Sequence, residues 1–375
     1  MESLQRIDLV GFGSLLAQLQ AEGYTLIGPR LEAGTIDYGA IEGPDDLPIG
    51  WRDEQSPGRY RTLPRNDRAH FGFNATPASF KTRLHRSEET VLEVQRGEQG
   101  ELRFVPVIPA VKKQAWIGAR SCELAALAIQ DRVLKDSANP DPRYAARREG
   151  VFIVAVHCGQ AGGTCFCTSM NAGPKAEGGF DLALTEILDG PEHHFVVETG
   201  SDAGAALLER IPHSQATAAD LRRAADAIEH ARATMGRHLD TDGLKTALYA
   251  QAQHPGWEEV ADRCLACGNC TAACPTCFCS SYEDQVELDG ANARRTRHWD
   301  SCFNADFTHL AGGPVRASTP ARYRQWLTHK LASWHDQFGT SGCVGCGRCI
   351  TWCPVGIDIT AEASRIRQAN GEPPK

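Results

Sequence analysis

Apolar and polar positions alternate differently in two regions of the chain. Before residue 240, short apolar runs alternate with segments of helical periodicity. The continuous run VFIVAVHC (151–158) is typical of a strand that is buried on both faces of a sheet. QAWIGA (114–119) predicts another strand, and SCELAALAIQDRVL (121–134) predicts a helix with Ser121 as a candidate cap. We therefore expect an α/β or α+β N-terminal domain.

Further elements follow in this first region. RFVPVIPAV (103–111), DLALTEIL (181–188) and HHFVVETG (193–200) predict strands. The segments 201–211 and 217–236 have helical periodicity, with Ser201 and Thr217 as candidate caps.

Beyond about residue 240 the strand signals vanish. The remaining apolar residues fall at helical spacing, interrupted by Cys-Pro pairs and Gly-rich loops. We expect this part to be a mainly α-helical domain, and we place the boundary between residues 215 and 245. The predicted domains are 1–235 and 236–375.

Charge and hydropathy exclude some classes of function. The formal net charge is −8, and no segment gathers Lys and Arg, so nucleic acid is not an expected partner. The chain has no apolar run of 18 residues and no signal-peptide pattern at its N-terminus. These features predict a cytoplasmic protein without a membrane span.

The chain has fifteen cysteines, and they are clustered rather than scattered. Disulfides do not persist in a reducing compartment, so closely spaced thiols there are metal ligands or redox groups more often than disulfide partners.

Two cysteine motifs have the same spacing. CLACGNCTAACP (264–275) and CVGCGRCITWCP (343–354) both follow C-x-x-C-x-x-C-x-x-x-C-P, the pattern that holds [4Fe-4S] clusters in bacterial-type ferredoxins. In proteins with two clusters the fourth cysteine of each motif binds the other cluster. The predicted ligands are Cys264, Cys267, Cys270 and Cys353 for the first cluster, and Cys274, Cys343, Cys346 and Cys349 for the second. A tetrahedral zinc site is the alternative, but two identical four-cysteine runs favour clusters.

Seven cysteines lie outside these motifs. Cys122 and Cys158 each follow a predicted strand, and carboxyl ends of adjacent parallel strands are where α/β sheets bind ligands. With Cys165 and Cys167 in the loop GQAGGTCFC, they are candidate ligands of a third [4Fe-4S] cluster. Alternatives are core packing of single cysteines and a pooled site of Cys165, Cys167, Cys277 and Cys279.

The other three cysteines, Cys277, Cys279 and Cys302, are candidates to hydrogen-bond or shield a nearby cluster. In the segment ARYRQWLTHK (321–330), Arg322, Arg324 and Lys330 either face a cluster or an acidic partner, or lie on a solvated helix face.

Motifs for other chemistry are missing from the sequence. There is no P-loop, no H-E-x-x-H, no nucleophile elbow and no complete dinucleotide fingerprint. We interpret His193 and His194 as a surface or capping pair. Because iron–sulfur clusters pass one electron at a time, a chain without its own flavin or nicotinamide site is expected to relay electrons between partners. A free-standing iron–sulfur oxidoreductase with its active site between Cys122 and Cys167 is an alternative.

Several longer segments carry a family resemblance. They include LPIGWRDEQSPGRYR (47–61), GARSCELAALAIQDRV (118–133), HCGQAGGTCFCTSM (157–170) and HWDSCFNADFTHLAGGPVR (298–316). With the two cluster motifs, they resemble the iron–sulfur beta subunit of NAD(P)-linked sulfhydrogenases, which are soluble nickel–iron hydrogenases. The related A subunit of anaerobic sulfite reductase shares this resemblance.

The resemblance implies an electron-transfer subunit rather than a catalyst by itself. Its partners would be a flavin-containing, NAD(P)-binding diaphorase subunit and the small and large subunits of a nickel–iron hydrogenase. In the sulfite reductase alternative, a sirohaem subunit replaces the hydrogenase. Family members tend to have Pro-Cys-Asp where this chain has Ser121-Cys122-Glu123.

Overall fold

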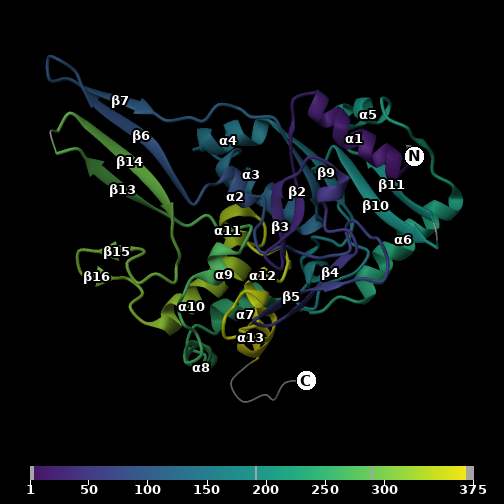
Figure 1. The fold of residues 1–375 in the computed structure, drawn as a ribbon. Coiled ribbons are helices and arrows are strands. Elements are labelled where there is room, and N and C mark those ends of the chain that lie inside the picture. Colours follow the sequence, from purple (N-terminus) through teal and green to yellow (C-terminus); the bar gives the residue numbers. More distant parts are fainter. Residues whose placement is uncertain (1–3, 191, 289, 369–375) are drawn as a thin grey trace.

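An eight-stranded mixed sheet forms the centre of the N-terminal region in the computed structural model, which describes residues 4–190, 192–288 and 290–368 (Figure 1). The strands lie in the order β12 (Ser214–Gln215), β1 (Gln5–Asp8), β11 (Glu192–Thr199), β10 (Leu182–Asp189), β9 (Val151–Val156), β8 (Gln114–Ala119), β2 (Thr25–Glu32) and β3 (Thr35–Ala40). β2, β8, β9 and β10 are parallel to their neighbours in this group, and the outer pairs are antiparallel. The mixed α/β character predicted for this region is confirmed.

Helices cover both faces of this sheet. One face buries α1 (Leu9–Ala21) and α5 (Asp202–Leu208), whereas the other buries α3 (Ser121–Leu134) and α4 (Pro142–Glu149). α6 (Ala218–Ala233) packs on β10 and β11. The central strands are therefore buried on both sides, which explains their continuous apolar sequences.

The predicted helix caps are confirmed in two cases and wrong in one. The Ser201 and Thr217 side chains accept hydrogen bonds from the first turns of α5 and α6. Ser121 is instead the first residue of α3, and the capping position is Arg120. The Arg120 guanidinium donates to the carbonyl oxygens of Phe71 and Phe73, which fixes the chain entering the helix.

The C-terminal region is built on short helices: α7 (Leu244–Ala250), α8 (Gly256–Ala261), α9 (Asn269–Ala272), α10 (Thr319–Thr328), α11 (Trp334–Phe338), α12 (Arg348–Thr351) and α13 (Ile359–Arg367). A π-helical turn, η3 (His329–Ser333), joins α10 to α11. These elements share a core of aromatic and aliphatic side chains, and several cysteines pack against it.

The expectation that strands are absent after residue 240 is wrong. β13 (Ser280–Val286) and β14 (Asn292–Trp299) form a hairpin, and two very short strands follow, β15 (His309–Leu310) and β16 (Gly313–Pro314). β13 and β14 are largely exposed and rich in charges, so they lack an apolar pattern. Pairing with another strand and cross-strand bonds such as Arg295 to Asp284, 2.7 Å, stabilise them instead.

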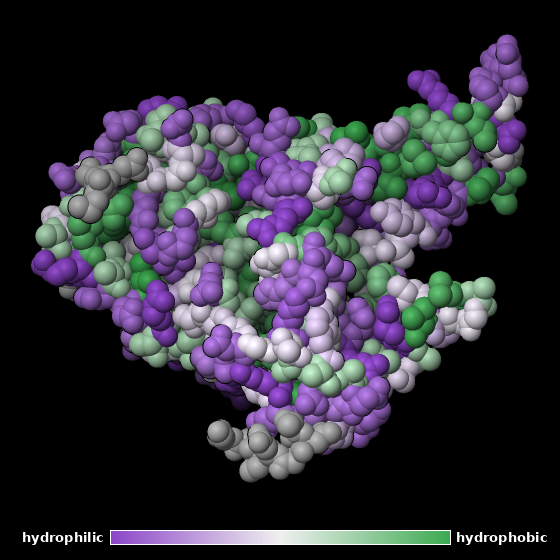
Figure 2. All heavy atoms as spheres, turned by 180° about the vertical axis from the view of Figure 1, so that it is seen from behind, coloured by the Kyte–Doolittle hydropathy of each residue, from purple (hydrophilic) through white to green (hydrophobic). Residues whose placement is uncertain are grey.

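This hairpin completes a sheet with strands from the N-terminal region. β14 pairs with β6 (Glu88–Arg96), which pairs with β7 (Leu102–Pro106), and the four strands project from the body as an arm (Figure 1). An apolar row, Val286, Ala293, Val94 and Phe104, crosses all four strands. Figure 2 shows hydrophobic residues along this arm.

The remaining elements connect the two regions. The hairpin of β4 (Trp51–Ser56) and β5 (Arg59–Pro64) reaches the C-terminal region, where Gly58 N–H donates to the carbonyl oxygen of Ile350 at 3.1 Å. The short helices α2 (Lys81–Leu84), η1 (Pro44–Asp46) and η2 (Cys167–Met170) complete the fold. Within the described residues, no helix has the length and apolar character needed to cross a membrane.

Candidate iron–sulfur site

The fifteen cysteines form no disulfide. Most of them gather where the helical region meets the edge of the large sheet. We describe them as three thiol groups. Thiol group 1 is Cys264, Cys267, Cys270 and Cys353; thiol group 2 is Cys274, Cys343, Cys346 and Cys349; and thiol group 3 is Cys122, Cys158, Cys165 and Cys167.

The four cysteines of thiol group 1 line one cavity. Its empty volume is about 440 Å³, and its walls include the aromatic side chains of Phe303, Tyr323 and Trp326. Two backbone amides point at the sulfurs: Ala266 N–H donates to Cys264 Sγ at 3.4 Å, and Ile357 N–H to Cys353 Sγ at 3.3 Å. Amide donors of this kind and a space between four thiols suit an iron–sulfur cluster. The cavity places Cys353 of the second motif beside three cysteines of the first, and Cys349 also lines it.

In thiol group 2, the fourth cysteine of the first motif, Cys274, lies beside the first three cysteines of the second motif. Burial raises the pKa of Cys349, and the neighbouring Cys343, Cys346 and Cys274 raise it further. Gly345 N–H donates to Cys343 Sγ at 3.4 Å, which repeats the arrangement in thiol group 1. A metal cluster would stabilise the buried thiols of Cys343, Cys346 and Cys349 as thiolates.

A buried lysine lies against thiol group 2. Lys330 Nζ donates to Cys274 Sγ at 3.1 Å, to Thr276 Oγ1 at 3.2 Å and to the carbonyl oxygen of Gly342 at 3.0 Å. The bond from Cys277 and the ammonium of Lys330 hold the pKa of Cys274 well below its usual range. Lys330 therefore does not lie on a solvated helix face but faces thiol group 2.

Thiol group 3 forms at the edge of the large sheet. β8 and β9 are parallel neighbours, so Cys122, in the first turn of α3, and Cys158, after β9, lie at the same edge. Burial raises the pKa of Cys165, and the nearby thiols of Cys167 and Cys158 raise it further. Cys122 and Cys167 belong to one buried cluster of side chains. The structure thus brings together the four cysteines that the sequence proposes.

Thiol groups 2 and 3 are in direct contact. Cys346 packs with Cys122 and Cys167, and Cys165 Sγ lies 3.9 Å from the carbonyl oxygen of Cys346. Phe166 N–H donates to the carbonyl oxygen of Gly345 at 2.8 Å. A Cβ added to Gly345 would lie 2.5 Å from the backbone of Phe166, so only glycine permits this approach.

A buried ion pair joins the second cysteine motif to helix α3. Arg348, inside the second motif, pairs with Glu123, the residue after Cys122, and both side chains are at most 2% exposed. Glu123 also accepts a hydrogen bond from Phe80 N–H at 3.0 Å, and Arg348 donates to the carbonyl oxygen of Thr76 at 2.7 Å. Sequence reasoning did not foresee this pair, because its members are far apart along the chain.

The three cysteines outside the groups lie near one another and near thiol groups 1 and 2. Lys330 Nζ is 3.6 Å from Cys277 Sγ. Burial raises the pKa of Cys302 to about 12, with Cys279 as the nearest thiol contributing to the shift. Cys165 and Cys167 instead neighbour Cys158 and Cys346. This arrangement does not favour the pooled site and agrees with a supporting role for Cys277 beside thiol group 2.

The fold and the grouped thiols define an iron–sulfur protein of the electron-transfer class. Residues 263–357 match the family model described as a 4Fe-4S dicluster domain, which covers both cysteine motifs. The chain therefore carries [4Fe-4S] clusters.

A curated relative then identifies the family. The chain is 30% identical over 286 residues to sulfhydrogenase 2 subunit beta of Pyrococcus furiosus (strain ATCC 43587 / DSM 3638 / JCM 8422 / Vc1). The aligned region covers 76% of this chain and 81% of the relative. The chain belongs to the family of sulfhydrogenase beta subunits, as its sequence segments indicated. No solved structure is significantly similar to it.

Proposed function

We propose that this chain is an electron-transfer subunit that relays single electrons between a flavin-containing, NAD(P)-binding diaphorase subunit and a nickel–iron hydrogenase unit. The observation that carries the proposal is the contact between successive thiol groups. Cys349 of group 2 lines the cavity of group 1, and Cys346 of group 2 packs with group 3. Thiol groups in this order support a continuous route through the protein.

The three thiol groups are the proposed ligands of three [4Fe-4S] clusters. Bound clusters would supply reversible one-electron chemistry. The chain's own residues hold thiolates at fixed positions, donate amide hydrogen bonds to sulfur and keep water away with aromatic walls. Lys330 compensates negative charge on Cys274. Cys267 is exposed, so group 1 is the proposed point at which one partner exchanges electrons.

The division into domains 1–235 and 236–375 also belongs to this proposal. Separate hydrophobic cores support it: two core clusters fill the faces of the large sheet, and a third lies almost entirely within the helical region. We propose a cytoplasmic location, in keeping with soluble partners. The alternative catalytic partner is a sirohaem sulfite reductase subunit.

Iron analysis of the anaerobically purified chain tests the cluster count. Three clusters predict about twelve irons per chain, two predict about eight. Cys122→Ala and Cys165→Ala should each remove about four irons, whereas Cys302→Ala should remove none. An iron content that does not change in the first two variants would refute the role of thiol group 3.

Copurification tests the partners. A tagged chain isolated anaerobically from its source should retain a nickel-containing subunit and a flavoprotein. A sirohaem protein in their place would decide for sulfite reductase. Reduction of the isolated, flavin-free chain by NAD(P)H would contradict the relay, because a two-electron donor then needs no partner.

A further inference from the structure

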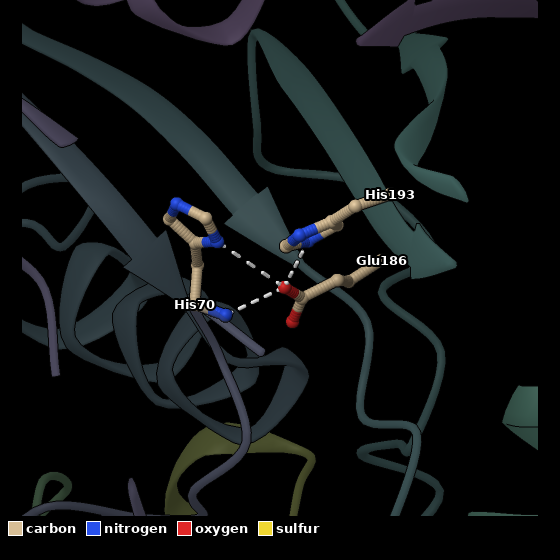
Figure 3. A group of neighbouring side chains, drawn as sticks. All are labelled: His70, Glu186 and His193. Carbon is tan, nitrogen blue, oxygen red and sulfur yellow. Dashed lines mark hydrogen bonds and ion pairs between the residues drawn. The ribbon is translucent and has the colours of Figure 1, made fainter. Parts of the chain in front are cut away.

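Three side chains with metal-binding atoms meet outside the three thiol groups (Figure 3). They are His70 from the loop after β5, Glu186 on β10 and His193 on β11. Glu186 lies directly opposite Phe195 in the β10–β11 ladder, and His193 is two residues before Phe195, so both project from the same face. The interpretation of His193 and His194 as a surface pair is therefore wrong: His193 is mostly buried, and His194 is fully buried and bonded to Asp220.

The donor atoms are close enough to share one ion. Glu186 Oε1 lies 2.8 Å from His193 Nε2 and 3.7 Å from His70 Nδ1. The three ligand atoms all lie within 4.8 Å of one another. A tetrahedral ion with bonds of about 2.1 Å separates its ligand atoms by about 3.4 Å, so the two distances to Glu186 bracket the required value. Small side-chain adjustments would suffice to complete the site.

Two features indicate that these groups are prepared for a ligand. His70 is 5% exposed, and its Nδ1 has no hydrogen-bond partner although it points toward the Glu186 carboxylate (Figure 3). A buried nitrogen of this kind is unfavourable unless something else satisfies it. The Glu186 carboxylate is fixed by the backbone N–H groups of His70, at 2.6 Å, and Phe71, at 2.9 Å. Backbone donors of this kind orient carboxylate ligands in metal sites.

The carboxylate is also reachable. Glu186 lines an open cavity with an empty volume of about 1120 Å³, bounded by the ends of β9 and β10, the loop containing Arg65 and Asp67, and α6. An ion could enter by this route without the protein unfolding.

We propose that His70, Glu186 and His193 bind one divalent transition-metal ion. Two imidazoles and one carboxylate are the donor set of zinc and of non-haem iron(II), whereas magnesium and calcium prefer oxygen ligands. The ion would replace the hydrogen bond between His193 and Glu186 and would satisfy His70 Nδ1. It would join the loop after β5 to the β10–β11 hairpin, at the sheet edge next to thiol group 3.

Zinc binding by the full-length, cluster-loaded chain tests the proposal. Anaerobic protein is dialysed against a mild chelator, its iron content is checked, and zinc is titrated against a chromophoric competitor. The wild type should bind one zinc. His70→Gln and His193→Gln should bind it at least about 100-fold more weakly, since even loss of an outer partner weakens metal sites by 10–100-fold. His309→Gln, which replaces an exposed histidine elsewhere, should bind as the wild type does.

Zinc X-ray absorption separates this site from the cysteines. Only nitrogen and oxygen neighbours at about 2.0–2.1 Å are expected, because sulfur ligands would lie at about 2.3 Å. Sulfur neighbours, or equal zinc affinity in the wild type and both variants, would overturn the proposal. Glutamine can keep the hydrogen bond to Glu186, and thermal unfolding without zinc should therefore be similar in His193→Gln and the wild type. A variant that does not fold is replaced by His193→Asn in the same titration.

Discussion

Replacing Lys330 by methionine should lower the reduction potential of the cluster proposed in thiol group 2. The Lys330 side chain is buried, and its ammonium lies 3.1 Å from Cys274 Sγ. An electron added to the cluster is attracted by this charge. Methionine keeps a similar length and removes both the charge and the hydrogen bond to sulfur, and the two losses act in the same direction.

The magnitude follows from Coulomb's law. The added electron is spread over the cluster, so a separation of about 6.5 Å and an effective dielectric constant of about 20 give an interaction of about 2.5 kcal/mol. Because about 1.4 kcal/mol corresponds to about 59 mV for a one-electron couple, the potential should fall by about 110 mV. The fall should be smaller where solvent or neighbouring dipoles relax around the vacated space.

Anaerobic redox titration followed by electron paramagnetic resonance measures this shift. Lys245→Met is the matched control, because Lys245 is exposed and pairs with Asp336 on the surface. One signal should shift in Lys330→Met and none in the control, with equal iron contents. An unchanged potential, or an upward shift, would show that the ammonium does not stabilise the reduced cluster.

Three further predictions concern stability. Gly345→Ala should lower the unfolding temperature strongly, because its Cβ would lie 2.5 Å from the backbone of Phe166. Gly34→Ala is the control, since φ is also positive there but a Cβ would have no atom within 4 Å. Equal losses of unfolding temperature in the two variants would refute the packing argument. Arg348→Met should destabilise the fold by about 3–5 kcal/mol, because it leaves the buried Glu123 carboxylate unpaired. Combining Arg348→Met with Glu123→Leu should recover most of this loss. A double variant as unstable as Arg348→Met would contradict this account. Burial lowers the pKa of His85 to about 3, so below pH 6.5 the unfolded state binds a proton that the folded state does not. The free energy of unfolding should therefore fall by about 1.4 kcal/mol per pH unit from pH 6.5 toward 3. Thermal unfolding between pH 7.5 and 5.5 should show a smaller pH dependence in His85→Asn than in the wild type. The same pH dependence in both proteins would refute the role of His85.

The fold was predictable where burial leaves a local pattern. The runs at 115–119 and 151–156 are apolar because both faces of β8 and β9 are covered, and the structure confirms both strands. β13 and β14 were missed because most of their residues are polar and give no alternating apolar pattern. Their stability depends on pairing with β6, a strand from the other region of the chain, and no local periodicity records such a partner.

The candidate site was also predictable only in part from the sequence. The cysteines of the two motifs follow a spacing that reflects the shape of a cluster, so their grouping could be predicted. Thiol group 3 required the further inference that β8 and β9 are parallel neighbours. Lys330 was ambiguous, because helical periodicity cannot show that the π-helical turn η3 directs it inward. His70 and Glu186 meet across 116 residues, and no motif signals this contact.

The packing of thiol groups 2 and 3 explains why the cluster motifs occur within a larger chain. Gly345 and Gly347 both have positive φ, and a Cβ on either would collide with the backbone of residues 164–167. These glycines thus serve the cluster loop and the contact with the sheet edge at once. The buried Arg348–Glu123 pair also joins the second motif to helix α3, which carries Cys122 of group 3. A change in the 164–167 loop should therefore disturb group 2 as well as group 3, and in the proposed relay the α/β region would then be part of the electron route.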